Sequence, residues 1–330
     1  MISDEQLRTC VHWLKLSCQP RLTHIKKQND VYRIDCDSDV FFLKTYTKDW
    51  YGSDIARTGL NAHHEATAWT ILAQHGLAAA EVVYVATSCD TPLARPFILT
   101  RQLGGTPFTT LLTSNHHQRH TLLSTVGSYL QQMHRITFTF PGYLTTLSGP
   151  TTPLDHQQWH HRCWSARHRQ EGTLAYLVQQ QEHLSLATFR EVFAACSQMA
   201  DRLAGAYQPP RFTHGDCHAH QFFLAESDRA WHVTGVVDME VTSAGDCGED
   251  LLKLSIELAQ SLAYKTRWWE ALFEGYGMIP DFELFRLRLL SATEPEFGTC
   301  GRWIGTATWE AMLRHFLHAT DWDTLFAPVA

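Results

Sequence analysis

Two aspartates in the second half of the chain have the surroundings of paired active-site carboxylates. Asp216 follows a break at Pro209-Pro210 and lies in the loop segment Thr213-His-Gly-Asp-Cys-His-Ala-His-Gln221. Asp238 follows the second of two short apolar runs, and the turn-forming residues 226–229 between these runs predict a hairpin. A hairpin of that length can bring its two ends, and with them both carboxylates, close together. Two carboxylates at one site repel each other unless a cation or a shared proton separates them. In phosphoryl transfer one aspartate accepts the proton of the nucleophile and the other holds Mg²⁺ on the nucleotide phosphates.

The order His-Gly-Asp-x-x-x-x-Asn, an apolar strand and then Asp-x-Glu is typical of the aminoglycoside phosphotransferase and choline kinase family, which this chain resembles. The resemblance implies the fold of the protein kinases, with Asp216 as the catalytic base and Asp238 as the residue that chelates Mg²⁺. Gln221 stands at the position of the family's asparagine, which is a metal ligand. The later segment Gly245-Asp-Cys-Gly-Glu-Asp-Leu251 resembles the family's Gly-Asp-x-x-x-Asp-Leu, which opens a structural helix. The match is specific because several spaced elements agree in order.

Gln221 is the main departure from the family pattern. Its amide oxygen can ligate Mg²⁺ as that of asparagine does, but the extra methylene moves the oxygen outward and adds rotamer entropy. Because Mg²⁺ requires near-octahedral geometry at short distances, the second metal position can be weaker or filled by water. The substitution therefore leaves open a degenerate kinase that binds nucleotide poorly.

Four other polar residues lie beside the two aspartates. His214 is expected to orient the loop and not to take part in catalysis. Glu240, two residues after the second aspartate, can reach a metal or a substrate amine, and it can equally pair with a nearby loop cation. His218 and His220 alternate beside the first aspartate, but Mg²⁺ prefers oxygen ligands and no Cys or His cluster completes a zinc set. We therefore interpret both as loop histidines.

The composition limits the class of protein. The chain has 330 residues and a formal charge of −7, and it is long enough for two lobes with substantial cores. No apolar run of about 18 residues predicts a membrane span, and the first residues do not resemble a signal peptide. Nine cysteines, an odd number without a Cys-x-x-Cys pair, favour reduced thiols in the cytoplasm over a disulfide framework. The negative charge disfavours general nucleic-acid binding and leaves room for a cationic substrate.

The first hundred residues predict a small β-rich lobe. Its expected elements are a helix from Ser3 to about Ser17, strands over 21–27, 31–37 and 40–46, a helix over 60–75, and strands over 82–86 and 97–100. Gly76 ends the second helix in the expected way.

Lys44 is a lone lysine in the apolar strand Phe41-Phe-Leu-Lys-Thr-Tyr46. A buried lysine needs a partner, whereas a lysine on an edge strand extends its ammonium group to water. In the resembled family this strand lysine contacts nucleotide phosphates and pairs with a glutamate of the next helix. Glu65 is the only acidic residue in that helix segment, and it is also compatible with a solvated glutamate favoured by the helix dipole.

Two further segments concern the nucleotide. Gln102 and Leu103 follow the last predicted strand and resemble the lobe linker whose backbone reads the adenine ring. Protein kinases hold the phosphates with a glycine-rich loop, but residues 23–32 of this chain contain no glycine. Lys26 or Lys27 could supply positive charge there, and a plain exposed turn is an equal alternative.

The remainder of the chain predicts a mostly helical lobe. The expected helices cover residues 108–113, 116–136, 157–183, 186–206, a stretch after 250, 264–276, 281–292 and 301–318. Residues 138–155 are rich in Thr, Pro and Gly and are expected to form a loop. Gln131-Gln-Met-His134 resembles the family's helix end, where the histidine is structural. The prediction is an α+β, bilobal protein-kinase-like fold with a nucleotide-binding lobe at 1–102 and a catalytic and acceptor-binding lobe at 103–330.

These features predict an enzyme that uses Mg²⁺ to move the γ-phosphate of ATP or GTP to a hydroxyl of a small molecule. The resemblance makes an aminoglycoside-type antibiotic the leading acceptor, with choline-like amines and amino sugars as alternatives. No nucleic-acid or membrane partner is expected. The rival interpretation is a catalytically silent pseudokinase that acts as a binding or regulatory module. Gln221 and the glycine-free loop favour this rival, whereas Lys44, Asp216 and Asp238 oppose it.

Overall fold

The structure is a computed structural model that describes residues 2–16, 20–27, 30–46, 60–150, 166–203, 209–262, 267–292 and 308–327. The chain divides into two compact units. The first comprises Met1–Thr106, Tyr143–Thr151 and Phe222–Thr242, and the second comprises Pro107–Gly142, Thr152–Gln221 and Ser243–Ala330. This division by packing differs from a single boundary after residue 102, so the lobe boundary expected from the sequence stays a prediction.

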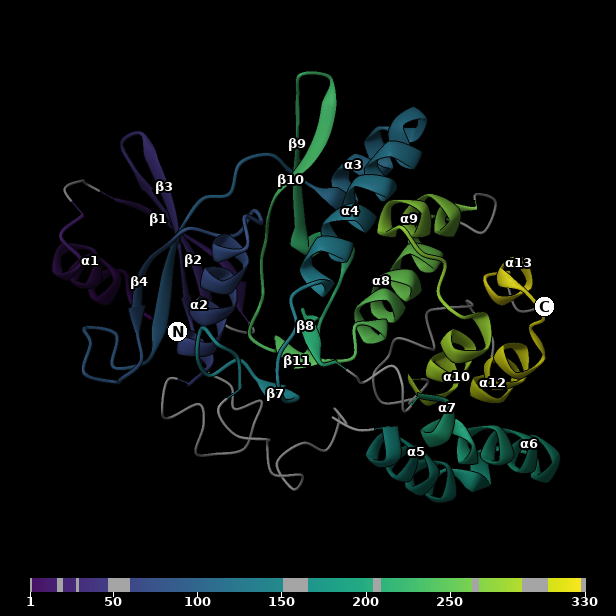
Figure 1. The fold of residues 1–330 in the computed structure, drawn as a ribbon. Coiled ribbons are helices and arrows are strands. Elements are labelled where there is room, and N and C mark those ends of the chain that lie inside the picture. The colour runs from purple at the N-terminus through teal and green to yellow at the C-terminus, as the bar shows by residue number, and fades with distance from the viewer. Residues whose placement is uncertain are drawn as a thin grey trace. The chain divides into compact units, whose positions relative to one another are not determined.

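An antiparallel five-stranded sheet forms the centre of the first unit (Figure 1). Its strands are β1 (Arg21–Lys27), β2 (Asp30–Cys36), β3 (Asp39–Thr45), β4 (Val82–Ala86) and β5 (Phe97–Arg101), in the spatial order β1-β2-β3-β5-β4. Buried and half-buried residues alternate along β2 and β3, as the two-residue period of a strand requires when one face is covered. The predicted strands are therefore confirmed to within about a residue at each end. Helix α2 (Leu60–Gln74) packs against β4 and β5.

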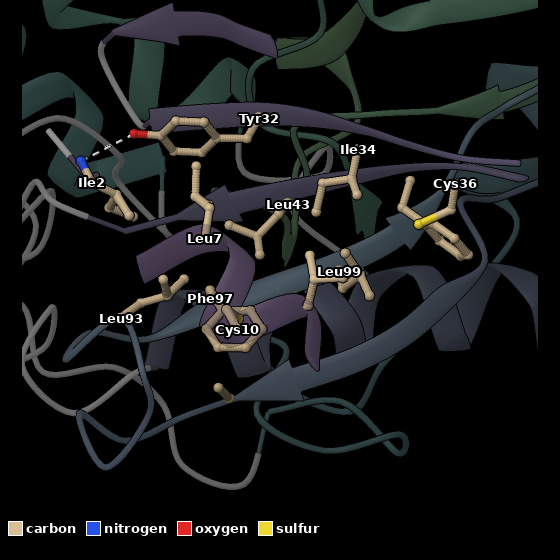
Figure 2. Packing of buried hydrophobic residues seen from close by; sticks show 13 residues of the cluster. Ile2, Leu7, Cys10, Tyr32, Ile34, Cys36, Leu43, Leu93, Phe97 and Leu99 are labelled. Carbon is tan, nitrogen blue, oxygen red and sulfur yellow. Dashed lines mark hydrogen bonds between the residues drawn. The ribbon is translucent and has the colours of Figure 1, made fainter. Parts of the chain in front are cut away.

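The hydrophobic core of this unit lies between the sheet and helix α1 (Asp4–Trp13), as Figure 2 shows. Ser3 begins the helix with a capping box, because its hydroxyl accepts from Gln6 while the Gln6 side chain accepts from the Ser3 backbone. The helix ends at Trp13, so the predicted end near Ser17 is wrong. Lys15 has a φ of 57°, and a residue in the left-handed region stops a right-handed helix.

A β-hairpin also belongs to the first unit. Strands β9 (Phe222–Ser227) and β10 (Ala230–Val236) pair antiparallel and are joined by Asp228 and Arg229, whose φ values are 52° and 63°. Positive φ at both residues of a two-residue connection gives the turn whose twist matches that of the strands. The hairpin expected from the sequence is thus confirmed.

The second unit is mostly helical. Its longer elements are α3 (Phe108–Ser114), α4 (Arg119–His134), α5 (Ala166–Gln179), α6 (Leu186–Ser197), α8 (Gly248–Ser261), α9 (Trp268–Tyr276), α10 (Phe282–Ala292) and α12 (Trp309–His318). The shorter ones are η2 (His116–Gln118), η4 (Gln181–His183), α7 (Met199–Leu203), η6 (Ala219–Gln221), α13 (Trp322–Leu325) and the antiparallel pair β8 (Arg211–Thr213) and β11 (Ser243–Gly245). The two-residue strands β6 (Thr106–Pro107) and β7 (Gly142–Tyr143) lie where the two units join along the chain.

Several predicted helices differ from the observed ones. The segment expected as one helix from 116 begins with the 3₁₀ turn η2, and the regular helix starts at Arg119. Helix α13 and the short strand β7 were not expected. The parts of the predicted helices that fall at 157–165, 204–206, 264–266 and 301–307 lie outside the described residues.

Helices α4 and α9 pack closely against each other (Figure 1). A Cβ atom added to Gly127 of α4 would overlap the backbone of Leu272, and one added to Gly275 of α9 would overlap the backbone of Ser124. The two helix backbones can therefore approach this closely only because both positions are glycine.

The cysteines and the apolar helices bear on the class of protein that the composition indicates. Cys36 is disulfide-bonded, so the expectation of reduced thiols throughout is wrong at this position, because an odd cysteine count does not exclude a single pair. The free thiols among the described residues are Cys10, Cys89, Cys196, Cys217 and Cys247. In the described part of the chain, no helix combines the length and apolar character needed to span a bilayer.

Candidate active site

Lys44 lies at the centre of a cluster of acidic residues in the first unit. Its Nζ is 2.9 Å from Oε2 of Glu65, 2.6 Å from Oδ1 of Asp238 and 3.3 Å from Oε2 of Glu240. Strand β3, helix α2 and the segment after β10 supply these side chains. The structure therefore brings together three residues singled out from the sequence, Lys44, Glu65 and Asp238, and it pairs Glu240 with the strand lysine, not with a loop cation.

Burial and the close charges of this cluster shift the pKa values of its members. Burial lowers the pKa of Lys44, but the carboxylates of Glu65, Asp238 and Glu240 outweigh it and hold that pKa well above its usual value. Burial next to two other carboxylates raises the pKa of Glu240 to about 7. The hydroxyl of Tyr46 donates a hydrogen bond to Oε2 of Glu65. One ammonium group thus balances a set of carboxylates that would otherwise repel each other.

Helix α2 holds the segment that carries Asp238. Nε1 of Trp69 donates to the carbonyl of Val236 at 2.8 Å, and Oε1 of Glu65 accepts from the backbone N–H of Met239 at 3.0 Å. Nδ1 of His64 lies 3.0 Å from the Glu240 carbonyl oxygen, which requires the tautomer that donates from Nδ1. Asp238 itself has a φ of 64°, a left-handed conformation that aspartate tolerates better than most residues.

The expected linker residues follow β5 directly. The backbone N–H of Gln102 donates to the carbonyl of Val40 at 2.8 Å, so this N–H is already used within the sheet. The Leu103 side chain packs against Gly235 of β10, where an added Cβ would overlap it. Gln102 is exposed and Leu103 is half-buried. The segment 23–32, where a phosphate loop or a plain exposed turn was expected, includes residues 28 and 29, which lie outside the described residues.

Asp250 anchors the loop that carries Asp216, in the second unit. Its two carboxylate oxygens accept from the backbone N–H groups of His214 at 2.7 Å and Gly215 at 2.8 Å. His134 donates from Nε2 to Asp250 across 3.1 Å, while its Nδ1 accepts from the hydroxyl of Tyr276 at 2.9 Å. Burial raises the pKa of Asp250, but the bond from His134 and the neighbouring charges lower it further, so the net shift is downward. The segment from Gly245 to Leu251 therefore opens helix α8, as its resemblance to the family motif predicts, and its Asp250 holds the loop that carries Asp216.

Asp216 is held by two cationic side chains and is about two-fifths exposed, with a side-chain value of 38%. Nζ of Lys253 is 2.6 Å from its Oδ1, and Nε2 of His218 is 3.4 Å from the same oxygen. Its backbone N–H donates to Nδ1 of His214 at 3.2 Å, which supports the expectation that this histidine orients the loop. Burial raises the pKa of Asp216, but His218 and Lys253 outweigh it and lower that pKa far below its usual value.

Gln221 is buried in the same loop region, with 1% of its surface exposed. Its Oε1 accepts from the backbone N–H of His218 at 2.9 Å, and its Nε2 makes no hydrogen bond to any described residue. Because a carbonyl oxygen has a second lone pair, this bond is compatible with a metal contact. Asp238 and Glu240 offer carboxylate oxygens, which are the ligands that Mg²⁺ prefers. Each of these side chains, taken by itself, offers an oxygen donor of the kind that Mg²⁺ prefers.

Glu257 connects the loop histidines to helix α8. Its carboxylate lies 3.5 Å from Nδ1 of His218 and 3.4 Å from Nδ1 of His220, and it accepts from the backbone N–H of Ala219. Hydrogen bonds to Asp216 and Glu257 overcome the effect of burial and raise the pKa of His218 to about 9. Within the described residues, no group of three or more His, Cys, Asp or Glu side chains could hold a metal ion. The interpretation of His218 and His220 as loop histidines stays a prediction.

Three residues in the groups around Lys44 and Asp216 were not expected from the sequence: Tyr46, Lys253 and Glu257. Tyr46 comes two residues after the strand lysine, so the strand period places both on one face. Lys253 and Glu257 follow Asp250 by three and seven residues, and this helical spacing places all three on one face of α8. The spacing was visible in the sequence, but their contacts depend on how the loop folds back onto the helix.

Comparison with known proteins identifies the class. Residues 27–290 match the phosphotransferase enzyme family (APH). The chain therefore belongs to this family, and it is a phosphotransferase that acts on a hydroxyl group of a small molecule. No curated protein matches the sequence significantly.

Solved structures with a similar fold include aminoglycoside phosphotransferases. The GDP complex of wild-type aminoglycoside 2'-phosphotransferase-IIIa has a TM-score of 0.60 at 13% identity, covering 97% of both chains. APH(3'')-Id from Streptomyces rimosus ATCC10970 has a TM-score of 0.56 at 15% identity, covering 88% of this chain and 98% of the other. The streptomycin-ATP-APH(2")-IIa ternary complex has a TM-score of 0.55 at 12% identity, covering 98% and 94%. The predicted protein-kinase-like α+β fold, β-rich first and mostly helical later, is confirmed.

Proposed function

We propose that the chain transfers the γ-phosphate of a nucleoside triphosphate to a small-molecule hydroxyl, with Lys44 and Asp238 in the nucleotide site and Asp216 as the base. The observation that carries this proposal is the ion-paired cluster of Lys44 with Glu65 and Asp238, residues separated from the lysine by 21 and 194 positions. An ammonium group held by two separate carboxylates is poised to contact phosphate oxygens when nucleotide enters. We further propose that residues 1–102 bind the nucleotide, through Lys44, Glu65 and the linker at Gln102 and Leu103.

Mg²⁺ is the proposed metal, with Asp238 as its main ligand and Gln221 as the second. When bound, the ion would neutralise charge on the phosphates and orient the transferred group. Some of the solved relatives were determined with ATP, ADP or GDP, which supports ATP or GTP as the phosphate donor of this chain.

Asp216 is the proposed base because it is an ionised carboxylate on an anchored loop. Its lowered pKa keeps it ionised at neutral pH, so it is always ready to accept a hydrogen bond from a hydroxyl. A positioned carboxylate of this kind contributes roughly 10²- to 10⁴-fold to the rate of a proton-transfer step.

An aminoglycoside-type antibiotic is the leading proposed acceptor, and resistance to such an antibiotic would then be the cellular consequence. Support comes from relatives determined with streptomycin and kanamycin and from the chain's net negative charge of −7, which suits a cationic acceptor. Choline-like amines and amino sugars remain candidate acceptors. The proposed compartment is the cytoplasm, although the disulfide at Cys36 counts against a strictly reducing environment.

The test is Mg²⁺-dependent nucleotide turnover across a panel of aminoglycosides and hydroxylated amines. We expect acceptor-dependent turnover that Asp216→Ala lowers by about 10²-fold or more and that Asp201→Ala, at an exposed position of α7 in the same unit, leaves unchanged. The absence of both turnover and a nucleotide-induced thermal shift would contradict the assignment and favour a silent binding module.

A further inference from the structure

One face of helix α8 makes direct contact with the loop that carries Asp216. Lys253 and Glu257 are four residues apart and therefore lie one above the other on that face. Lys253 reaches the Asp216 carboxylate, and Glu257 reaches the three residues 218–220. None of these contacts was expected from the motif that singled out Asp216.

The contact with Lys253 fixes the orientation of the carboxylate. Lys253 and His218 both approach Oδ1 of Asp216, at 2.6 Å and 3.4 Å. A charge-assisted hydrogen bond at the shorter distance is among the strong directional contacts of proteins. Because both cations use Oδ1, the same carboxylate can present its other oxygen, Oδ2, to an acceptor hydroxyl.

Glu257 supports this arrangement from the next turn of the helix. It lies 3.5 Å from His218, which is the second cation on Asp216, and it accepts the backbone N–H of Ala219. The charged and titratable groups that contact Asp216 or its neighbours in the loop are His214, Cys217 and His218 from the loop, and Asp250, Lys253 and Glu257 from α8. Lys253 is the cation of this set that comes from outside the loop.

We propose that Lys253 is a positioning residue of the phosphotransfer reaction, whose ammonium group orients the Asp216 carboxylate toward the acceptor hydroxyl, with Glu257 holding the loop in register. This inference rests on the proposed function of Asp216 as the base. Lys253 acts through Asp216, so its loss should lower kcat and leave nucleotide affinity intact. A base misplaced by about 1 Å can cost as much as 10²-fold in rate.

The first arm of the test is kinetic and compares Lys253→Met, Lys253→Arg and the control Arg190→Met, an exposed residue of α6 in the same unit. We expect Lys253→Met to lower kcat about 10- to 100-fold with the KM for nucleotide unchanged. Lys253→Arg should retain most of the wild-type kcat, because it keeps the positive charge. Equal kcat in Lys253→Met and wild type, or equal losses in the methionine and arginine variants, would overturn the proposal.

The second arm needs no activity. The carboxyl signal of Asp216 is followed by ¹³C NMR as a function of pH, after its assignment by comparison with Asp216→Asn. We expect its pKa to rise in Lys253→Met and to stay near the wild-type value in Lys253→Arg; an unchanged titration in Lys253→Met would overturn the lysine contact. If wild type transfers phosphate to no acceptor, the proposed function fails, and the titration still decides whether Lys253 holds Asp216.

Discussion

Lys44 has three carboxylates within 3.3 Å of its Nζ. Glu65, one of these three carboxylates, has two further contacts. One of its oxygens accepts from Lys44 and Tyr46, and the other accepts from the backbone N–H of Met239. Glu65 therefore links the position of the strand lysine to the position of the segment that carries Asp238.

We predict that Glu65→Ala lowers kcat/KM for the nucleotide at least about tenfold, which corresponds to 1.4 kcal/mol. The variant leaves the buried N–H of Met239 without its acceptor, so it should also lower the free energy of unfolding by roughly 1–3 kcal/mol. Steady-state kinetics and urea unfolding measure the two effects. Glu81→Ala, at an exposed glutamate of the same unit, is the matched control, and similar behaviour of both variants would contradict the prediction.

Residue types and spacing could single out Lys44, Glu65, Asp216 and Asp238, because each stands out against its local pattern. A lone lysine in an apolar strand and an aspartate after an apolar strand can be recognised from the sequence alone. The role of Lys253 was not visible, because it depends on a contact across 37 residues of chain. Gln221 was visible as a departure, but the use of its oxygen by a backbone N–H was not.

Among the elements, helices α4 and α9 require glycine where they meet. Gly127 and Gly275 lie where each helix meets the backbone of the other. His134 at the end of α4 and Tyr276 at the end of α9 then share a hydrogen bond that leads to Asp250. Close packing of these helices therefore determines where the anchor of the Asp216 loop sits.

We predict that Gly127→Ala destabilises the protein although alanine is the better helix former. The added Cβ would overlap the backbone of Leu272, and forcing extra volume into a packed contact costs about 1–3 kcal/mol. Thermal unfolding should show a lower Tm for Gly127→Ala than for Ser128→Ala, a half-buried position next to it in the same helix. A Tm for Gly127→Ala at or above that of wild type would contradict the predicted overlap.

The periodicity of the sequence was sufficient to predict most described strands and helices, because their buried faces follow the expected two-residue and helical periods. The ends of elements were less predictable. Helix α1 stops at Trp13 because Lys15 takes a left-handed conformation, which its residue type does not signal. Helix α13 has only four residues, begun by a capping box at Asp321, and is too short to show a period.

At the scale of the whole molecule, the two units draw on alternating stretches of the chain. Asp216 and Asp238 are only 22 residues apart in sequence. Asp216 nevertheless belongs to the mostly helical second unit, whereas Asp238 belongs to the first unit. The motif that links them therefore continues from one unit into the other. A single domain boundary in the sequence cannot describe this arrangement, because each unit is built from three separate stretches of the chain.

The stability of the protein toward acid should depend on Asp250, which is fully buried and receives three hydrogen bonds. Its pKa is lower in the folded protein than the ordinary value of 3.8. A carboxyl with a depressed folded-state pKa contributes stability that is present above the unfolded-state pKa and is lost as the pH falls through the folded-state pKa.

We predict that Asp250→Asn lowers the free energy of unfolding at pH 7 by about 3 kcal/mol, because the amide cannot replace a charge that accepts from two backbone N–H groups and His134. The difference from wild type should stay constant above about pH 5 and shrink below about pH 4, where the wild-type carboxyl begins to lose its advantage. Urea unfolding at a series of pH values measures this difference in the free energy of unfolding. Asp201→Asn, at an exposed aspartate, is the control. A difference that grows on acidification would mean that the Asp250 carboxylate does not stabilise the fold, and the anchoring of the Asp216 loop would need another source.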